Sequence, residues 1–312
     1  MPSNHSLVRA SLAVSLAILA GSIVVQGIQA PPTAGPYTHQ VLSASSPDGL
    51  TWTHDGVVLL EHASVPCVIV MPDGQLRIYY VDASQMPETV NCAESADGGT
   101  SFEPLGLSIA GLTSEKAVDP SIVRLENGRY RLFYYGANGD PGAAGTHYVR
   151  SAISDDGVHF RETGTALAYP GLVDPDVFKV RDKWLMFVFS LTEHTTMVAE
   201  SRNGRKFRKV RPLGLDGFGT TKPVQFDDGR FRLYAFDQRT QRTIVSFVSE
   251  DGLEWSQEAG VRLDAPIGKE ITDPQVVRLP DGGWKMDPKR RFTPHSRALR
   301  EPGWRDRTLR GL

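Results

Sequence analysis

Two short motifs alternate along the chain and share one period. The first is Ser-Xaa-Asp/Asn-Gly followed by Trp or Phe, and it begins at Ser46, Ser95, Ser154, Ser201 and Ser249. The second is Xaa-Pro, found at Val65-Pro66, Asp119-Pro120, Asp174-Pro175, Lys222-Pro223 and Asp273-Pro274. Each motif returns after 47 to 59 residues, and the two stay in phase. Five copies of one unit of roughly 50 residues constrain the chain to a repeat fold.

Each repeat carries the pattern of four short strands. An apolar run follows Xaa-Pro, as at 121–125, and an Asp-Gly or Asn-Gly turn leads to an aromatic strand such as 130–135. These turns supply the positive φ angles that tight hairpins require. A third strand runs into the Ser-Xaa-Asp-Gly motif, whose Trp or Phe begins a fourth. Four antiparallel strands in five repeats predict an all-β, five-bladed β-propeller over residues 38–286.

The ends of the repeat predict how the ring closes. The motif at Ser46 has no Xaa-Pro strand before it, and Asp273-Pro274 has no such motif after it. The N-terminal segments 38–45 and 51–60 are therefore expected to complete the sheet that 273–279 begins, which removes two exposed edges. Since the aromatic pattern of the second strand stops at Met286, we predict that the fifth blade is incomplete.

Residues 287–312 lose the blade pattern and contain eight Lys or Arg against three Asp or Glu. We predict a basic, disordered tail there. Two interpretations stay open: a basic binding segment, or an abrupt loss of the blade pattern such as a reading-frame change would cause.

The N-terminus has the features of an export signal. One Arg precedes a 16-residue apolar run, 10–25, which is short for a bilayer span, and small residues follow it. We predict a signal peptide over residues 1–30, with an uncleaved N-terminal anchor as the alternative. The protein is then secreted or periplasmic, with no stable membrane insertion after cleavage.

The overall charge argues against nucleic acid as a partner. The chain has 34 Lys plus Arg and 36 Asp plus Glu, a formal net charge of -2. This balance gives no global attraction to nucleic acid or to an anionic membrane surface.

Two cysteines, Cys67 and Cys92, fall on the first and third strands of the first blade. The strand between them separates them by about 9–10 Å at a strand spacing of roughly 4.7–4.9 Å. A disulfide needs Cα atoms closer than about 7 Å. Export favours a disulfide and blade geometry opposes it, so we predict two free, buried thiols.

The five blades, the Asp-Pro strand openings and the Ser-Xaa-Asp-Gly-Xaa-Xaa-Trp/Phe turns resemble the five-bladed propeller glycoside hydrolases. These are the arabinanase and xylosidase-like family 43, with the invertase and levansucrase families as relatives. The resemblance covers residues 38–286. It implies a carbohydrate substrate, a monomer, and a funnel on the propeller axis where three carboxylates perform acid–base chemistry on a glycosidic bond.

Glycoside hydrolysis needs one carboxylic acid to protonate the leaving oxygen and one carboxylate to activate water or attack the sugar. A propeller brings one residue per blade to its axis, so Asp119, Asp174 and Asp273 are expected to converge. Asp119 is the preferred base. Asp174 or Asp273 would tune the pair through like-charge repulsion.

The preferred general acid is Glu193, because its loop between the second and third strands of the third blade returns to the funnel. Glu115 and Glu270, just ahead of their Asp-Pro motifs, are rivals for this role. Lys222, His194 and Asp176 are the candidate substrate-binding residues.

Two axial positions depart from the family-43 pattern. The first blade of that family opens with the catalytic Asp, where this chain has Val65. The fourth blade presents Lys222, which suits neutralisation of a carboxylate cluster. A non-catalytic carbohydrate- or protein-binding propeller therefore stays open as the alternative function.

Cofactor signals are weak. The eight His residues lack the spacing of a zinc site, so no metal ligands are assigned. Calcium near the axis, as in some family-43 relatives, remains possible, and no organic cofactor is expected. The Ser-Xaa-Asp-Gly motifs themselves are expected to be structural, with Ser and Asp bonding turn amides.

Overall fold

The computed structural model describes residues 34–292 and the backbone of 305–306. The predicted signal peptide, 1–30, lies outside the described residues, as do 293–304 and 307–312 of the predicted tail. No helix in the described part of the chain is long and apolar enough to cross a membrane.

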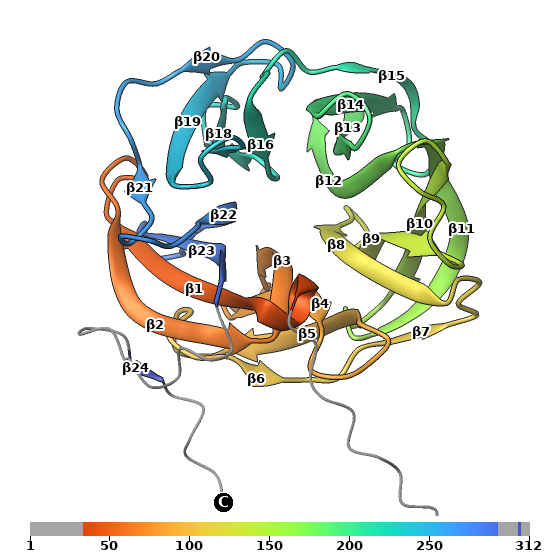
Figure 1. Cartoon of the computed structure of the whole chain (residues 1–312), viewed down its shortest axis with the longest axis horizontal. Helices are drawn as coiled ribbons and strands as arrows, with labels where there is room; N and C mark the ends of the chain where they lie inside the picture. The colour runs from red at the N-terminus through yellow and green to blue at the C-terminus, as the bar shows by residue number, and fades with distance from the viewer. Residues whose placement is uncertain (1–33, 293–304, 307–312) are drawn as a thin grey trace, which may run out of the picture. The chain divides into compact units, whose positions relative to one another are not determined.

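Five β-sheets surround one axis (Figure 1), which confirms the predicted all-β, five-bladed propeller. A short 3-10 helix, η1 (Gly35–Thr38), precedes the first strand. The first blade contains β3 (Ala63–Val70), β4 (Leu76–Asp82), β5 (Thr89–Ser95) and β6 (Glu103–Pro104). The second contains β8 (Lys116–Arg124), β9 (Tyr130–Ala137), β10 (Thr146–Ser154) and β11 (His159–Pro170), with β7 (Ser108–Ala110) at its outer edge.

The remaining blades follow the same plan. The third contains β12 (Leu172–Val180), β13 (Lys183–Ser190), β14 (Thr195–Ser201) and β15 (Arg208–Pro212). The fourth contains β16 (Phe218–Thr220), β17 (Val224–Gln225), β18 (Phe231–Asp237), β19 (Thr243–Ser249), β20 (Ser256–Gln257) and β21 (Leu263–Asp264). The fifth contains β22 (Thr272–Arg278), β23 (Trp284–Arg291), β1 (His39–Ser46), β2 (Thr53–Glu61) and β24 (Arg305–Asp306).

The fifth blade confirms one expectation and corrects another. The N-terminal strands β1 and β2 complete the sheet that β22 begins, as predicted. The prediction of an incomplete blade is wrong, because β23 continues to Arg291 and pairs with β22 on one side and β1 on the other. The charged residues of this strand hid it from the sequence pattern. Lys289 and Arg291 line the axial cavity, and Lys285 pairs with Asp55 of β2 in the same sheet.

The Ser-Xaa-Asp-Gly motifs join neighbouring blades. Ser154 Oγ accepts a hydrogen bond from Gly157 N–H at 2.9 Å, which holds the turn. Gly157 has φ +76°, and a Cβ there would lie 2.9 Å from the Tyr79 hydroxyl. That Tyr79 hydroxyl, on β4 of the preceding blade, donates to the Gly157 carbonyl at 2.8 Å. Tyr234 on β18 makes the same bond to the Gly49 carbonyl, at 2.7 Å. The motif therefore has the expected structural role.

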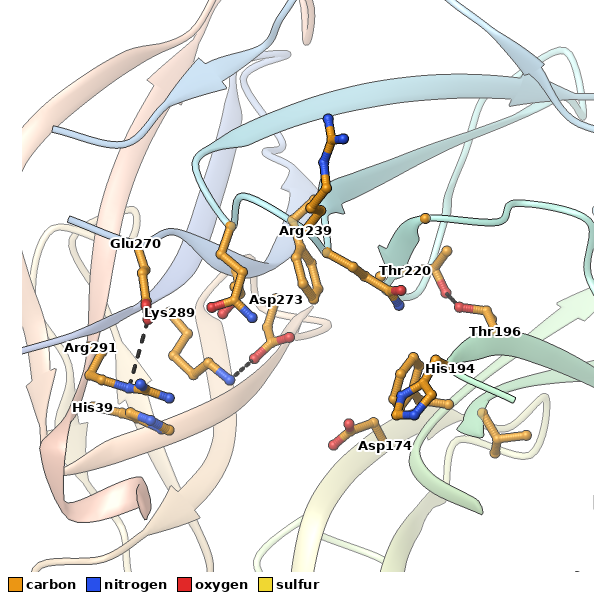
Figure 2. A pocket seen from close by; sticks show the side chains of 18 residues that line it. His39, Asp174, His194, Thr196, Thr220, Arg239, Glu270, Asp273, Lys289 and Arg291 are labelled. Atoms are coloured by element: carbon orange, nitrogen blue, oxygen red, sulfur yellow. Dashed lines mark hydrogen bonds and ion pairs between the residues drawn. The ribbon is translucent and has the colours of Figure 1, made fainter. Parts of the chain in front are cut away.

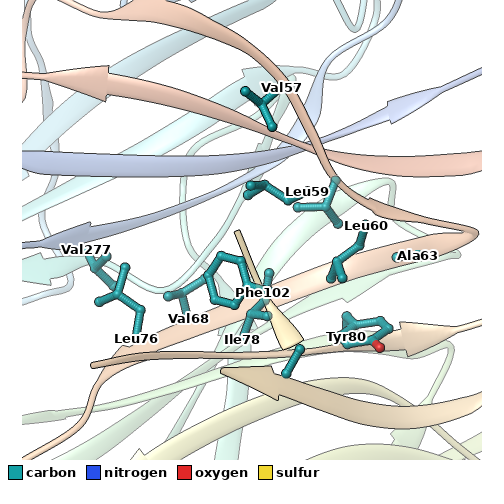
Figure 3. Packing of buried hydrophobic residues seen from close by; sticks show 12 residues of the cluster. Val57, Leu59, Leu60, Ala63, Val68, Leu76, Ile78, Tyr80, Phe102 and Val277 are labelled. Atoms are coloured by element: carbon teal, nitrogen blue, oxygen red, sulfur yellow. The ribbon is translucent and has the colours of Figure 1, made fainter. Parts of the chain in front are cut away.

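Apolar side chains fill the contacts between adjacent blades. Figure 3 shows the cluster between the fifth and first blades, where Leu60 of β2 packs with Val68 and Ile78 of β3 and β4. Four similar clusters complete the set found among the described residues. Burial of apolar surface therefore holds the blades side by side, and the pairing of β1 with β23 joins the two ends of the chain.

The Xaa-Pro motif adopts one unusual backbone conformation in four blades. Val65, Asp119, Asp174 and Asp273 have φ of 45°, 54°, 51° and 48°. In each case the strand register shifts directly afterwards, which is the signature of a β-bulge. Such a bulge redirects the side chain. In the fourth blade the inner strand is split instead, and Lys222 lies between β16 and β17.

A left-handed conformation is costly for a β-branched residue, whereas Asn and Asp tolerate it. We therefore expect Val65→Asn to raise the free energy of unfolding by about 0.5–1 kcal/mol, because it relieves strain of roughly 1–2 kcal/mol at a half-buried site. Urea unfolding monitored by tryptophan fluorescence measures this. Val68→Asn, in the same strand but with ordinary φ, should destabilise strongly; equal losses from both variants would contradict the strain argument.

Both cysteines are free and buried, as predicted. Cys67 and Cys92 each stand opposite Tyr79 in the register of the first blade. Two strand spacings therefore separate them.

Candidate active site

A cavity of about 530 Å³ opens at the end of the axis where the inner strands begin (Figure 2). Its walls come from the third, fourth and fifth blades, and Asp174 and Asp273 both line it. The bulge conformation of each Asp-Pro motif places these carboxyl groups there, near the beginning of β12 and β22. Two of the three predicted axial carboxylates thus share one cavity.

Asp119 belongs to the same electrostatic cluster. Burial raises the pKa of Asp119 well above its ordinary value, and the charge of Asp174 adds to this effect. Burial, followed by the charge of Asp273, raises the pKa of Asp174 to about 6. The carboxyls of Asp119 and Asp174 are close enough to share a hydrogen bond. The structure therefore brings the three residues together as expected, with Asp119 behind Asp174 rather than in the cavity lining.

Lys289 is the cation of this cluster. Its Nζ forms an ion pair with the Asp273 carboxylate. Burial would lower the pKa of Lys289, but the charges of Asp273, Asp174 and Asp119 outweigh it and raise that pKa. Lys289 was not among the predicted site residues, because the blade pattern stops at Met286 and residues 287–312 were predicted to form a tail. The signal that could have found it is its register position, since β23 places Lys289 opposite Thr272, next to Asp273.

Lys222 and Asp176 do not line this cavity: Asp176 is buried, and the half-buried Lys222 lines a second, smaller cavity. Lys222 Nζ donates to the Ile122 carbonyl at 3.1 Å and lies 3.6 Å from Cys67 Sγ. Burial raises the pKa of Asp176 to about 7, against the opposing charge of Lys222. Lys222 therefore acts electrostatically on Asp176, and it does not reach the carboxyl groups in the cavity wall.

The predicted acid, Glu193, lies outside the cavity lining. Its side chain is exposed at the tip of the β13–β14 turn, where its N–H donates to Ser190 Oγ at 3.1 Å. Its neighbour His194 does line the cavity. Of the two rivals, Glu270 lines it, 3.7 Å from Arg291, whereas Glu115 accepts a hydrogen bond from Gly139 N–H at 3.3 Å in a surface loop.

The remaining lining suits a polyhydroxylated ligand. Phe189 and Phe236 offer apolar faces, and hydroxyl and amide groups surround them, from Thr196, Thr220, Gln238 and Gln241. Sugars present C–H faces and hydroxyl groups, so aromatic planes with nearby donors and acceptors match them. No sequence motif marks these residues, because they come from separate turns and strand ends.

Among residues 34–292, no group of three or more His, Cys, Asp or Glu is placed to hold a metal ion. The positive charge among the axial carboxylates comes from Lys289.

Comparisons with known proteins agree on the fold. No protein-family profile matches the sequence, and no curated protein matches it. Among solved structures, a protein of unknown function from Dyadobacter fermentans superposes with TM-score 0.58 at 15% identity, covering 81% of this chain and 84% of that one. A thermostable family-43 glycoside hydrolase gives 0.57 at 14% identity, covering 78% and 96%. Zg3597, a family 117 glycoside hydrolase from Zobellia galactanivorans, gives 0.56 at 15%, covering 86% and 94%. At this identity the likeness shows the five-bladed propeller fold alone.

Proposed function

We propose that the protein is an exported glycoside hydrolase that cleaves a glycosidic bond of an oligo- or polysaccharide in the axial cavity. The observation that carries the proposal is a pair of carboxyl groups in one sugar-sized cavity whose surroundings differ. Asp174 has a pKa raised to about 6 by burial and by Asp273, whereas Asp273 is paired with the Lys289 ammonium. Two carboxyl groups in different surroundings can take different roles, one as a proton donor and the other as an ionised partner.

Each group then has a role. Asp174 donates a proton to the leaving glycosidic oxygen, and burial together with the charge of Asp273 keeps that proton in place until then. Asp273, ion-paired with Lys289, stabilises the positive charge that develops on the sugar ring. Glu193, preferred from the sequence, has no role in this assignment because it stands outside the cavity lining.

A non-catalytic carbohydrate-binding propeller is the second candidate. The observation in its favour is Val65, which occupies the axial bulge of the first blade where three other blades carry Asp. A binder would use the same cavity and the same polar lining without bond cleavage.

Purified protein assayed on a panel of 4-nitrophenyl glycosides and on arabinan and xylan oligosaccharides tests the proposal. We expect release of reducing sugar or nitrophenol on at least one member. Binding by calorimetry without turnover on any member would favour the carbohydrate binder, and neither binding nor turnover would contradict both.

The same assay separates the two candidate acids. Glu193→Gln should change kcat/KM by no more than about threefold, because surface substitutions away from the reacting groups have small effects. A loss of about 10²-fold or more would return the acid role to Glu193.

A further inference from the structure

The first blade lacks an ionisable group at its axial bulge. Val65 has the same left-handed backbone conformation as Asp119, Asp174 and Asp273, yet its side chain can neither donate nor accept a proton. The assigned carboxyls also leave one task unfilled. Asp174 donates a proton and Asp273 is held by Lys289, so hydrolysis still requires a group that takes a proton from the attacking water.

His39 stands beside that position. It is the first residue of β1 in the fifth blade, is only 9% exposed, and lines the cavity. Its Nδ1 lies 2.9 Å from the Oγ of Ser64, the residue immediately before Val65. The hydrogen bond thus ties the imidazole of the fifth blade to the first blade. In Figure 2 His39 lies with Lys289 and Arg291 on one side of the cavity, and Asp174 lies with His194 on another.

We propose that His39 is the general base that activates water, in place of the carboxylate that Val65 cannot supply. The inference rests on the proposed glycosidase function. When Nδ1–H donates to Ser64 Oγ, the lone pair is on Nε2, which is then free to accept a proton from water. In this tautomer Ser64 Oγ accepts the hydrogen bond and holds the ring in position.

The step balances without a cofactor. Asp174 gives its proton to the leaving oxygen as the C1–O bond breaks. A water oxygen bonds to C1 from the other side, and its proton passes to His39 Nε2. The products are a sugar hemiacetal, the alcohol of the leaving group, an Asp174 carboxylate and a His39 imidazolium. Exchange with solvent returns the proton from His39 and restores the one on Asp174.

The surroundings of His39 give it the proton affinity of such a base. Burial, followed by the charge of Lys289, lowers its pKa to about 4; Arg291 acts in the same direction and Asp273 opposes them. The charged groups that face it are thus Lys289 and Arg291 on β23 and Asp273 on β22, with Glu270 next to Arg291. A neutral imidazole with that pKa resembles a carboxylate, whose ordinary pKa is roughly 4. Asp273 would stabilise the imidazolium as it forms.

The first test is chemical rescue. On a substrate that the wild type cleaves, His39→Ala should lower kcat by about 10²–10⁴-fold with little change in KM. Sodium azide, a nucleophile that needs no deprotonation, should restore part of the rate and yield a glycosyl azide. A loss with no azide product, in a variant whose circular dichroism is unchanged, would reduce His39 to a structural role. Retained activity would overturn the proposal.

The second test restores the missing carboxylate. The double variant His39→Ala with Val65→Asp should recover activity relative to His39→Ala, because Asp at position 65 adopts the bulge conformation of the other blades. The matched control, His39→Ala with Val65→Asn, has the same shape but no base and should recover nothing. Equal rates for the two double variants would contradict the replacement of one base by the other.

A third measurement needs no turnover and separates the two hypotheses. Nitrogen NMR of the wild type should show His39 with a proton on Nδ1 and none on Nε2 at pH 7, and Ser64→Ala should disturb this tautomer. A proton on Nε2 would overturn the inference for His39. If the wild type cleaves no glycoside, the proposed function fails. If the wild type is active, Asp174→Asn is inactive and His39→Ala is still active, only the inference for His39 fails.

Discussion

Asp174→Asn should abolish most of the hydrolytic activity. The amide keeps the shape of the side chain but cannot give a proton to the leaving oxygen, so kcat is expected to fall by about 10²–10⁴-fold. The loss should be largest for natural sugar leaving groups. It should nearly vanish for 2,4-dinitrophenyl glycosides, whose leaving group needs no proton. Initial rates on the two substrate types measure this difference.

The pH profile gives an independent measure of the same group. Asp174 acts in its protonated form, and burial together with Asp273 raises its pKa to about 6. The rate constant kcat/KM should therefore be level below pH 6 on this limb and fall tenfold per pH unit above it. In Asp174→Asn this alkaline limb should be lost.

Asp155→Asn is the matched control, because it makes the same chemical change at a carboxyl whose side chain is 85% exposed. Its kinetics should equal those of the wild type. The assignment of Asp174 is contradicted by a uniform loss for good and poor leaving groups alike, which would indicate damage to binding or folding.

Asp287→Asn should stabilise the fold at neutral and alkaline pH. Asp287 is 1% exposed, and neither carboxyl oxygen has a hydrogen-bond partner among the described residues. Burial raises its pKa from 3.8 to about 7, with Lys285 opposing the shift and Asp55 adding to it. The folded state therefore holds a proton that the unfolded state releases above pH 4. Stability falls as pH rises from about 4 to 7 and then levels off.

The size of this effect follows from the shift. One pKa unit corresponds to about 1.4 kcal/mol, so the advantage of Asp287→Asn over the wild type should grow by about 2–4 kcal/mol between pH 4 and pH 8. At pH 4 the variant should gain nothing, because the buried amide lacks partners just as the acid does. Urea unfolding at both pH values measures the difference. Burial also raises the pKa of Asp176 to about 7, so the variant keeps part of the wild-type slope.

Asp55→Asn provides a control of opposite sign. Asp55 accepts hydrogen bonds from Lys285 Nζ and Ser45 Oγ, both at 2.8 Å, and its pKa is lowered because these and other hydrogen bonds outweigh the effect of burial. Loss of the Asp55 carboxylate should destabilise the protein most at neutral pH. The destabilisation should become smaller as pH falls through the pKa that Asp55 has in the folded protein. The same sign for both variants would show that charge in this blade, rather than its pairing, sets the stability.

The resemblance between the five repeats was sufficient to predict the ring. Turn residues and strand alternation act over a few residues, so the Ser154–Gly157 turn and the 130–135 strand could be identified from neighbours in the chain. Closure by β1 and β2 followed from the count of motifs at the two ends. The convergence of Asp119, Asp174 and Asp273 followed from their shared place in the repeat, since repetition fixes which residue of each blade reaches the axis.

Tertiary structure alone decided the other features of the site. Glu193 and His194 are adjacent in the sequence and both exposed, yet only His194 lines the cavity, because the direction of a turn depends on the blades beside it. Lys289 and His39 are 250 positions apart and meet only because β1 and β23 pair to close the ring. The burial of a charged strand such as β23 depends on partners distant in the sequence. No local pattern could reveal that Lys289 is the cation beside Asp273.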